Sequence, residues 1–154
     1  TDNANLNDLN GLLATNGALD GSMRISNNQS LESLNGLKFK SDITFAVEIK
    51  GNPLLADISA MNAINKVGRD LIISDNQALG NLDGLSNLFS VGNLNDSNNG
   101  YGLTITNNKS LVDFCGLTYL FNEGIHYKLN LALNGYNPTT NQMKEGECAL
   151  EQEE

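Results

Sequence analysis

The sequence predicts a mostly β fold, a short parallel solenoid of about five coils of roughly 24 residues each. Three observations carry this prediction. One pattern of apolar residues recurs along the chain, an asparagine follows each apolar segment at a fixed distance, and a residue that tolerates unusual backbone angles precedes that asparagine. The chain has 154 residues, enough for one domain with one core, so we expect a single solenoid domain over 1–154.

The repeat has the form apolar-x-apolar-x-x-Asn-x-x-Leu-x-x-apolar-x-small-apolar. Complete copies begin at Met23, Val47, Leu71 and Leu103, and a degenerate copy ends at Asn134. Apolar residues that alternate with period two are typical of a strand with one buried face, and one such strand per coil gives a parallel sheet. Coils of this length fall in the leucine-rich-repeat range of about 20 to 29 residues.

One asparagine follows each predicted strand, at the bend of the coil. The four in complete copies are Asn28, Asn52, Asn76 and Asn108. An inward carboxamide at a bend can bond backbone groups of its own and neighbouring coils that the bend leaves unpaired. We therefore expect these side chains to stack as a ladder.

Two further columns have a physical explanation. The residue before each ladder asparagine is of a type that adopts positive φ at low cost, and we expect positive φ there. Its members are Asp2, Asn27, Gly51, Asp75 and Asn107. The small position near the end of each copy admits alanine, so close packing explains it better. Its members are Gly11, Gly36, Ala60, Gly84 and Gly116.

The chain divides into segments by its repeats. Residues 1–21 form an incomplete N-terminal coil, and residues 22–134 hold the repeats. The step from Asn76 to Asn108 is 32 residues instead of 24, and the excess falls in 92–102, an Asn- and Gly-rich insertion that predicts a protruding loop.

The C-terminal part departs from the repeat. Residues 135–148 are expected to cap the last coil, with a helical turn over 139–144 that begins from Asn137 or Thr139 as its N-cap. Residues 149–154 are expected to be a solvated acidic tail.

Charge and hydropathy exclude several classes of partner. The formal net charge is −9, which repels phosphate backbones and anionic lipid, so we expect no nucleic-acid partner. No run of about 18 apolar residues is present, so no membrane insertion of this chain is expected. A removed N-terminal signal or lipid anchor is compatible with this expectation.

The repeats resemble a known group of proteins. The phrases ISNNQSLESLNGL, IKGNPLLADISAM, ISDNQALGNLDGL and ITNNKSLVDFCGL look like repeats of bacterial surface proteins related to receptor L domains, and YNPTTNQMKEGEC resembles the ending of such proteins from Bacteroides-type gut bacteria. The resemblance covers Asn3 to Cys148. It implies a right-handed β-helix of leucine-rich-repeat character in an exported protein on the cell surface or secreted, and it assigns no ligand.

Two cysteines are present, too few for a protein-only zinc site. Cys115 lies in an otherwise polar, outward column and Cys148 lies in the predicted cap, so a bridge would pin the cap to the last coils. For an exported protein we expect this disulfide rather than two unpaired thiols. We expect no cofactor and no bound metal.

The polar column two residues after the template leucine raises a calcium hypothesis, which we weigh against turn hydrogen bonding. Its members are Asp8, Ser33, Asp57, Asn81 and Asp113. Acidic members two coils apart would be about 10 Å apart, too far to share one ion without other ligands, so we expect turn bonding. The single histidine, His126, is expected at the surface or at a strand edge.

The candidate binding surface combines the outer strand face with the loop. Outward positions on the strands are Arg24, Glu48, Ile72 and Thr104, and the loop offers Asp96 and the aromatic Tyr101. A second row beside these strand positions, which includes Ser26, Lys50 and Ser74, is also expected to point outward. This face is small, mixed and flat and lacks an aromatic row for stacking sugars, although flat solenoid faces bind proteins. The alternative is a plain solvated sheet.

These features predict a noncatalytic binding or adhesion module of an exported bacterial surface protein, with a protein or glycan ligand. One alternative is a structural spacer in a larger surface protein. A second is a β-helix carbohydrate-active enzyme, which needs grouped Asp, Lys or Arg on adjacent coils. The columns contain no such group, so we do not expect an enzyme.

Overall fold

The computed structural model describes residues 1–10, 19–38, 42–92 and 102–150. Two of the predicted surface residues, Asp96 and Tyr101, lie outside these ranges, as does most of the predicted loop over 92–102.

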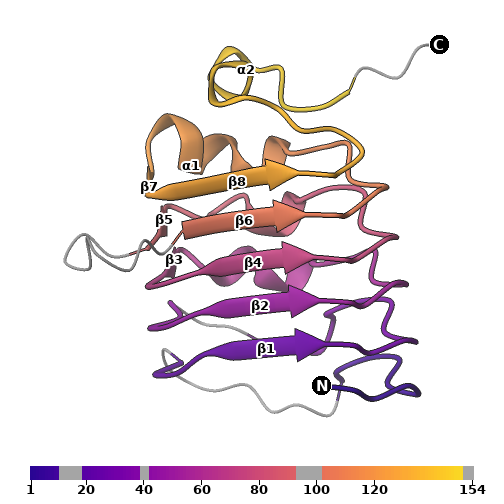
Figure 1. Cartoon of the computed structure of the whole chain (residues 1–154). Coiled ribbons are helices and arrows are strands. Elements are labelled where there is room, and N and C mark those ends of the chain that lie inside the picture. Colours follow the sequence, from indigo (N-terminus) through magenta and orange to yellow (C-terminus); the bar gives the residue numbers. More distant parts are fainter. Residues whose placement is uncertain (11–18, 39–41, 93–101, 151–154) are drawn as a thin grey trace.

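Five parallel strands form the larger sheet of the described chain, in the order β1-β2-β4-β6-β8. Figure 1 shows them as a stack with β1 at the bottom and β8 at the top. Paired residues such as Arg24 and Glu48 are 24 positions apart in the sequence, which is the period of the repeat. The strands are β1 (Met23–Ser26), β2 (Val47–Lys50), β4 (Leu71–Ser74), β6 (Gly102–Thr106) and β8 (Lys128–Ala132).

A second parallel sheet lies behind the first and has the order β3-β5-β7. Its strands are β3 (Lys66–Val67), β5 (Ser90–Val91) and β7 (Ile125–His126). Single bridges from Leu19 to Ile43 and from Ile43 to Val67 continue the same row toward the N-terminal end.

Short helices lie in the connections between the two sheets, and a further one, α2, follows β8. In the described residues three are 3-10 helices and two are α-helices. They are η1 (Ser59–Ala63), η2 (Asp83–Leu85), η3 (Cys115–Leu117), α1 (Thr118–Asn122) and α2 (Thr140–Glu145).

The predicted fold class, a mostly β solenoid, is wrong. The described chain is a mixed α/β arrangement of two parallel sheets and short helices. The prediction rested on the strand period, which does not report on the segment between the template leucine and the end of each copy. In that segment Leu85 N–H donates to the Leu82 carbonyl at 2.8 Å and Leu117 N–H to the Phe114 carbonyl at 2.9 Å, so the chain closes helical turns there.

One apolar cluster unites both sheets and the helices. Val47 and Ile49 of β2 are fully buried while Lys50 is exposed, the alternation expected of a strand with one face in a core. Val67 and Val91 of the second sheet are equally buried, and Met61 of η1 joins them. The space between the sheets is therefore filled by aliphatic side chains.

The predicted column of positive φ is confirmed. The φ angles are 58° at Asp2 and at Asn27, 67° at Gly51, 59° at Asp75 and 57° at Asn107. Leu133, the residue before Asn134, is a sixth member at 59°, although its residue type does not favour positive φ. A leucine has neither the freedom of glycine nor the short polar side chain of asparagine, so this residue carries backbone strain.

Replacing Leu133 by asparagine should raise the free energy of unfolding by about 1 kcal/mol. The leucine side chain is 74% exposed, so little burial is lost, and asparagine adopts the left-handed conformation at lower cost. Urea denaturation of both proteins measures the difference. An equal or lower midpoint for the variant would contradict the inferred strain.

Close packing is confirmed as the reason for the small column at Gly84 and Gly116. A Cβ atom would lie 2.1 Å from the Ile58 carbonyl oxygen at Gly84, and 1.9 Å from the Leu82 carbonyl oxygen at Gly116. Gly36 differs, because its φ of 101° adds a conformational requirement to the same contact.

The C-terminal cap is larger than predicted. The helix α2 begins after Thr139, whose side chain accepts from Gln142 N–H in a capping box, and it buries Met143 completely. Ala149 then forms an antiparallel bridge with Asp113, and Leu150 N–H donates to the Val112 carbonyl at 3.0 Å. The first two residues of the predicted tail, Ala149 and Leu150, are therefore paired with the last repeat.

Candidate functional site

The four ladder asparagines lie in one buried column beside the larger sheet, each at most 1% exposed. The Asn52 Oδ1 atom accepts from Asn28 N–H at 3.1 Å and from Asn28 Nδ2 at 3.0 Å. The Asn76 Oδ1 atom accepts the same two groups of Asn52, both at 3.1 Å. The Asn108 Oδ1 atom continues the pattern with Asn76 at 3.0 and 3.4 Å.

The same carboxamides also bond to the strands. Three of the four Nδ2 groups donate to the carbonyl of an isoleucine in the strand of the preceding repeat: Asn52 to Ile25 at 3.1 Å, Asn76 to Ile49 at 3.0 Å and Asn108 to Ile73 at 3.1 Å. The ladder thus fixes the register of each strand relative to the next, because each asparagine side chain bonds to groups of a neighbouring repeat.

The ladder has a built C-terminal end. Asn134 N–H and Nδ2 donate to the Asn137 Oδ1 atom at 3.2 and 2.9 Å. Asn137 thus provides the acceptor that another repeat would provide, and Thr139 rather than Asn137 is the N-cap of α2.

The predicted strand-face residues lie side by side. Glu48 of β2 pairs with Arg24 of β1 on one side and with Ile72 of β4 on the other, and Ile72 pairs with Thr104 of β6. The Arg24 Nε atom is 2.9 Å from the Glu48 Oε2 atom, but the arginine side chain is 66% exposed. An ion pair so open to water adds little stability, and both groups remain available to a partner.

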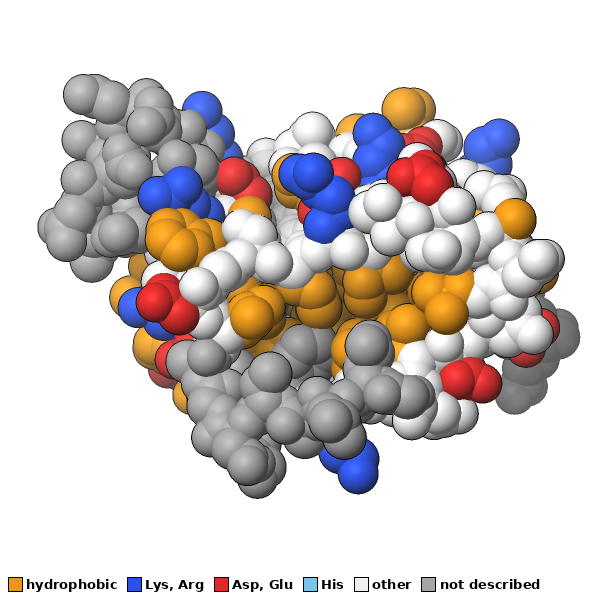
Figure 2. Space-filling view, turned by 90° about the horizontal axis from the view of Figure 1, so that it is seen from below, with side chains coloured by type: hydrophobic (Ala, Val, Ile, Leu, Met, Phe, Trp, Pro, Cys, Tyr) orange, Lys and Arg blue, Asp and Glu red, His pale blue; other side chains and the backbone are white. Residues whose placement is uncertain are grey.

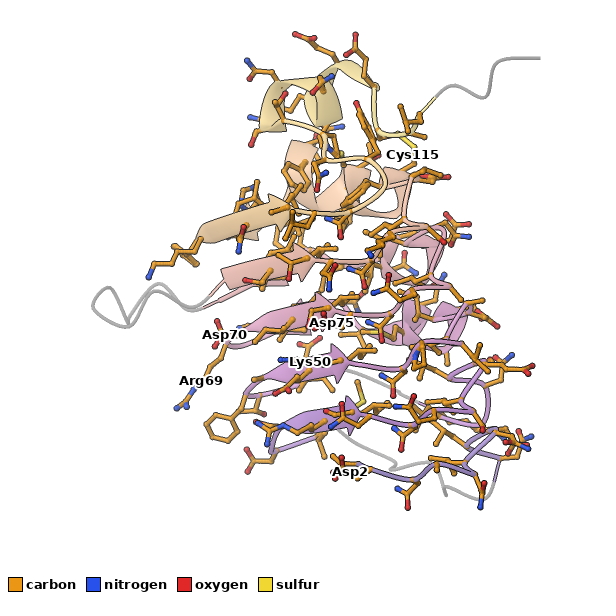
Figure 3. All side chains as sticks on the ribbon, turned by 45° about the vertical axis from the view of Figure 1, so that its right-hand side comes forward. Asp2, Lys50, Arg69, Asp70, Asp75 and Cys115 are labelled. Atoms are coloured by element: carbon orange, nitrogen blue, oxygen red, sulfur yellow. A yellow bond between two sulfur atoms is a disulfide. The ribbon has the colours of Figure 1, made fainter. Side chains whose placement is uncertain are left out.

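The neighbouring row on this face differs from expectation. Ser26 and Ser74 were predicted to point outward beside Lys50, yet each is only 6% exposed. Lys50 itself is exposed, and Figure 3 shows it on β2 between the labelled Asp2 and Asp75. The exposed part of this face is therefore the row from Arg24 to Thr104 together with Lys50.

The loop stems lie at one corner of the molecule. Gly102 N–H donates to the Asp70 Oδ1 atom at 3.0 Å, and Gly92 N–H donates to the Val67 carbonyl at 3.0 Å. The Arg69 guanidinium carbon lies 4.5 Å from the centre of the Phe45 ring at the same corner. Figure 3 shows Arg69 and Asp70 projecting at this edge of the larger sheet.

Cys115 and Cys148 form a disulfide, with their Cα atoms 4.9 Å apart. Beside it, Phe114 N–H donates to the Cys148 carbonyl at 2.8 Å. The bridge joins η3 to the segment that follows α2, so it holds the cap against the last repeat.

Replacing both cysteines by serine should lower the free energy of unfolding by about 3 kcal/mol, because the bridge closes a loop of 33 residues in the unfolded chain. Denaturation of the double variant measures this loss, and reduction of the native protein should reproduce it. A variant as stable as the native chain would show that the hydrogen bonds of the cap suffice to hold it.

The polar column after the template leucine makes turn hydrogen bonds. Asp57 Oδ1 accepts from Ser59 N–H at 2.8 Å, and Asp113 Oδ1 accepts from Cys115 N–H at 2.8 Å. The bond from Ser59 N–H, followed by hydroxyl and amide bonds from Ser59, Ser33 and Asn35, lowers the pKa of Asp57. Within the described ranges, no three His, Cys, Asp or Glu side chains are grouped to hold a metal ion.

His126 lies in β7 at the edge of the core, with its ring 4.9 Å from the Phe121 ring. Burial lowers the pKa of His126, and the nearby Lys144 charge lowers it further. Its Nδ1 atom is buried and has no hydrogen-bond partner among the described residues.

Sequence reasoning missed an exposed aromatic pair behind the larger sheet. Phe89 and Tyr119 are 37% and 46% exposed, with ring centroids 5.6 Å apart. The sequence contained one sign of this exposed pair: Phe89 is aromatic, whereas the residue one repeat earlier, Asn65, is polar. Tyr119 follows the insertion, so the repeat alone did not bring the two residues together.

Comparison with known proteins gives no relative: no family model, no curated protein and no solved structure matches the chain. No helix in the described part of the chain is long and apolar enough to cross a bilayer; the longer α-helix, α2, has six residues.

Proposed function

We propose that the protein is a noncatalytic binding module of an exported bacterial surface protein, and that the outer face of the five-stranded sheet contacts its ligand. The single observation that carries this proposal is the in-register row of Arg24, Glu48, Ile72 and Thr104 on adjacent strands. A cation, an anion, an aliphatic side chain and a hydroxyl lie next to one another on a rigid surface, which is the mixed chemistry of protein-binding faces.

Two other features support the proposal. The ladder and the strand pairs hold the row in one conformation, so binding does not have to order these residues. The disulfide between Cys115 and Cys148 is typical of oxidising compartments, which agrees with export. The bacterial origin and the surface location rest on the resemblance of the repeat phrases to bacterial proteins related to receptor L domains.

The test is a screen of the labelled chain against arrayed extracellular proteins and glycans, followed by titration of any binder with two face variants. Ile72→Arg and Thr104→Arg should each weaken binding about tenfold or more, because a long cation then projects from the flat row. Ala56→Arg is the matched control, since Ala56 is exposed outside the strands of the larger sheet. Equal affinity for all three variants would place the contact elsewhere.

A structural spacer is the second candidate, favoured by the apolar end of the molecule at β1. A cavity of about 500 Å³ opens there among Leu6, Leu9, Met23, Ile25 and Leu37. Figure 2 shows apolar side chains gathered in a hollow on this end. A spacer predicts no binder on the array and self-association through this end at high concentration. Sedimentation velocity of Met23→Glu, compared with the native chain, tests that association.

A further inference from the structure

The corner formed by β5, α1 and β7 carries a cluster of exposed apolar side chains that the sheet-face proposal does not use. We call Phe89, Tyr119 and Ile125 the aromatic corner. Ile125 is 40% exposed, and its N–H donates to the Phe89 carbonyl at 2.8 Å, which holds it beside the aromatic pair. The two rings are inclined at 44° to each other, so they form an angled wall rather than a flat stack.

Exposed carboxamide side chains occur on the chain segments that carry the two aromatic residues. Asn87, two residues before Phe89, donates from Nδ2 to the Asn62 carbonyl at 3.0 Å and also bonds the Asn62 side chain. Asn62 in turn donates to the Ser86 Oγ atom at 3.2 Å. Both asparagines are exposed, as is Asn122 at the end of α1. Asn87 and Asn122 are thus exposed neutral donors and acceptors within three residues of Phe89 and Tyr119 in the sequence, and Asn62 is bonded to Asn87.

The size of the aromatic corner favours a small ligand unit over a protein face. Its three side chains expose on the order of 250 Å² in total, well below the roughly 800 Å² that each partner buries in a stable protein interface. A surface of this size matches one or two sugar rings. The net charge of −9 disfavours polyanionic chains, so the chemistry fits an uncharged sugar.

We propose that the aromatic corner is a second binding site and that it takes a neutral glycan, whose ring C–H groups pack on Phe89 and Tyr119 while its hydroxyls bond to the amides of Asn62 and Asn87. The site is separate from the outer face of the larger sheet, because its residues come from the second sheet, the helices and the connection from η2 to β5. Glycan binding here does not require the sheet face to have a ligand.

The probes are four uncharged oligosaccharides: cellohexaose, xylohexaose, mannohexaose and maltoheptaose. Titration of the full chain is followed by the aromatic side-chain signals in two-dimensional NMR. We expect at least one probe to shift the ring signals of Phe89 and Tyr119 in a saturable manner. The identity of the active probe distinguishes a glucan from a xylan or mannan.

Three variants test the placement. Phe89→Leu and Tyr119→Leu keep an apolar side chain of similar reach and remove the ring face, and each should weaken binding about tenfold. Tyr127→Leu is the matched control, because Tyr127 is 38% exposed and lies in the connection from β7 to β8. Its affinity should equal that of the native chain. Thermal unfolding of all three shows whether a loss of binding is a loss of folding.

Two results would overturn this inference. The first is the absence of any ring-signal shift with all four probes at about 10 mM, a concentration that detects binding free energies near −3 kcal/mol. The second is glycan binding that both leucine variants retain in full. Either result leaves the sheet-face proposal intact, since that proposal is tested with Ile72→Arg and Thr104→Arg. Loss of binding in those two variants with unchanged glycan affinity would show two independent sites.

Discussion

Replacing Asn76 by alanine should lower the free energy of unfolding by about 4 kcal/mol. The Asn76 side chain accepts from Asn52 N–H and Nδ2 and donates to the Ile49 carbonyl, all in buried surroundings. Alanine removes these bonds, so Asn52 N–H loses its acceptor and the Ile49 carbonyl loses this donor, while Asn52 Nδ2 keeps its bond to the Ile25 carbonyl. Each unsatisfied buried group costs about 1–3 kcal/mol. The methyl group replaces none of the bonds and leaves space that is too enclosed for full hydration.

Chemical denaturation of Asn76→Ala measures this loss. Asn7→Ala is the matched control, because Asn7 is an exposed asparagine outside the ladder, and its replacement should change stability by less than about 0.5 kcal/mol. If Asn76→Ala and Asn7→Ala unfold at the same midpoint, the buried carboxamides do not contribute what their bonds imply.

Replacing Gly116 by alanine should lower the free energy of unfolding by about 4 kcal/mol, at the upper end of overpacking effects. The added Cβ would lie 1.9 Å from the Leu82 carbonyl oxygen and 2.4 Å from the Leu82 carbonyl carbon. Both atoms belong to the backbone of the preceding repeat, so no side chain can rotate to make room. The two repeats must separate, which weakens the packing of η2 against η3.

Gly21→Ala provides the matched control for Gly116→Ala. Nothing lies within 4 Å of the Cβ position at Gly21, and its φ is not in the left-handed region, so the same substitution should be neutral or slightly stabilising. Thermal unfolding of the two variants gives the comparison. A Gly116→Ala protein that melts with the native chain would mean that the repeats stand farther apart than the contact requires.

The periodic features of this chain could be predicted from sequence because the same residue types recur at the same positions of each repeat. The positive φ at Asp2, Asn27, Gly51, Asp75 and Asn107 follows from residue types that share one conformational property. The strand faces likewise follow from alternating apolar residues, as at Val47 and Ile49 of β2. Local rules suffice where the same local environment recurs.

The class of the fold could not be predicted in the same way. The 3-10 helices begin where side chains such as Asp57 and Asp113 accept a hydrogen bond from the backbone N–H two residues later. The spacing of apolar residues does not indicate such a bond. Leu133 also has a positive φ, although leucine disfavours this conformation, because its position in the repeat determines the backbone angle.

The candidate sites were predictable only in part, for a similar reason. The row from Arg24 to Thr104 follows from strand register, which the repeat specifies. The contact between Phe89 and Tyr119 crosses the long insertion and the start of α1, so it depends on tertiary geometry. The burial of Ser26 and Ser74 likewise depends on neighbours that surround a short side chain rather than on the strand period.

The central claim is that the buried asparagine ladder holds the five strands in register and so keeps the proposed binding face rigid. Native-state hydrogen exchange of the backbone N–H groups of Asn52, Asn76 and Asn108 tests it most directly, since each donates to the carboxamide oxygen of the next ladder residue. These amides should be among the slowest to exchange, with opening free energies close to that of global unfolding. Exchange as fast as that of amides at the exposed corners would contradict the claim.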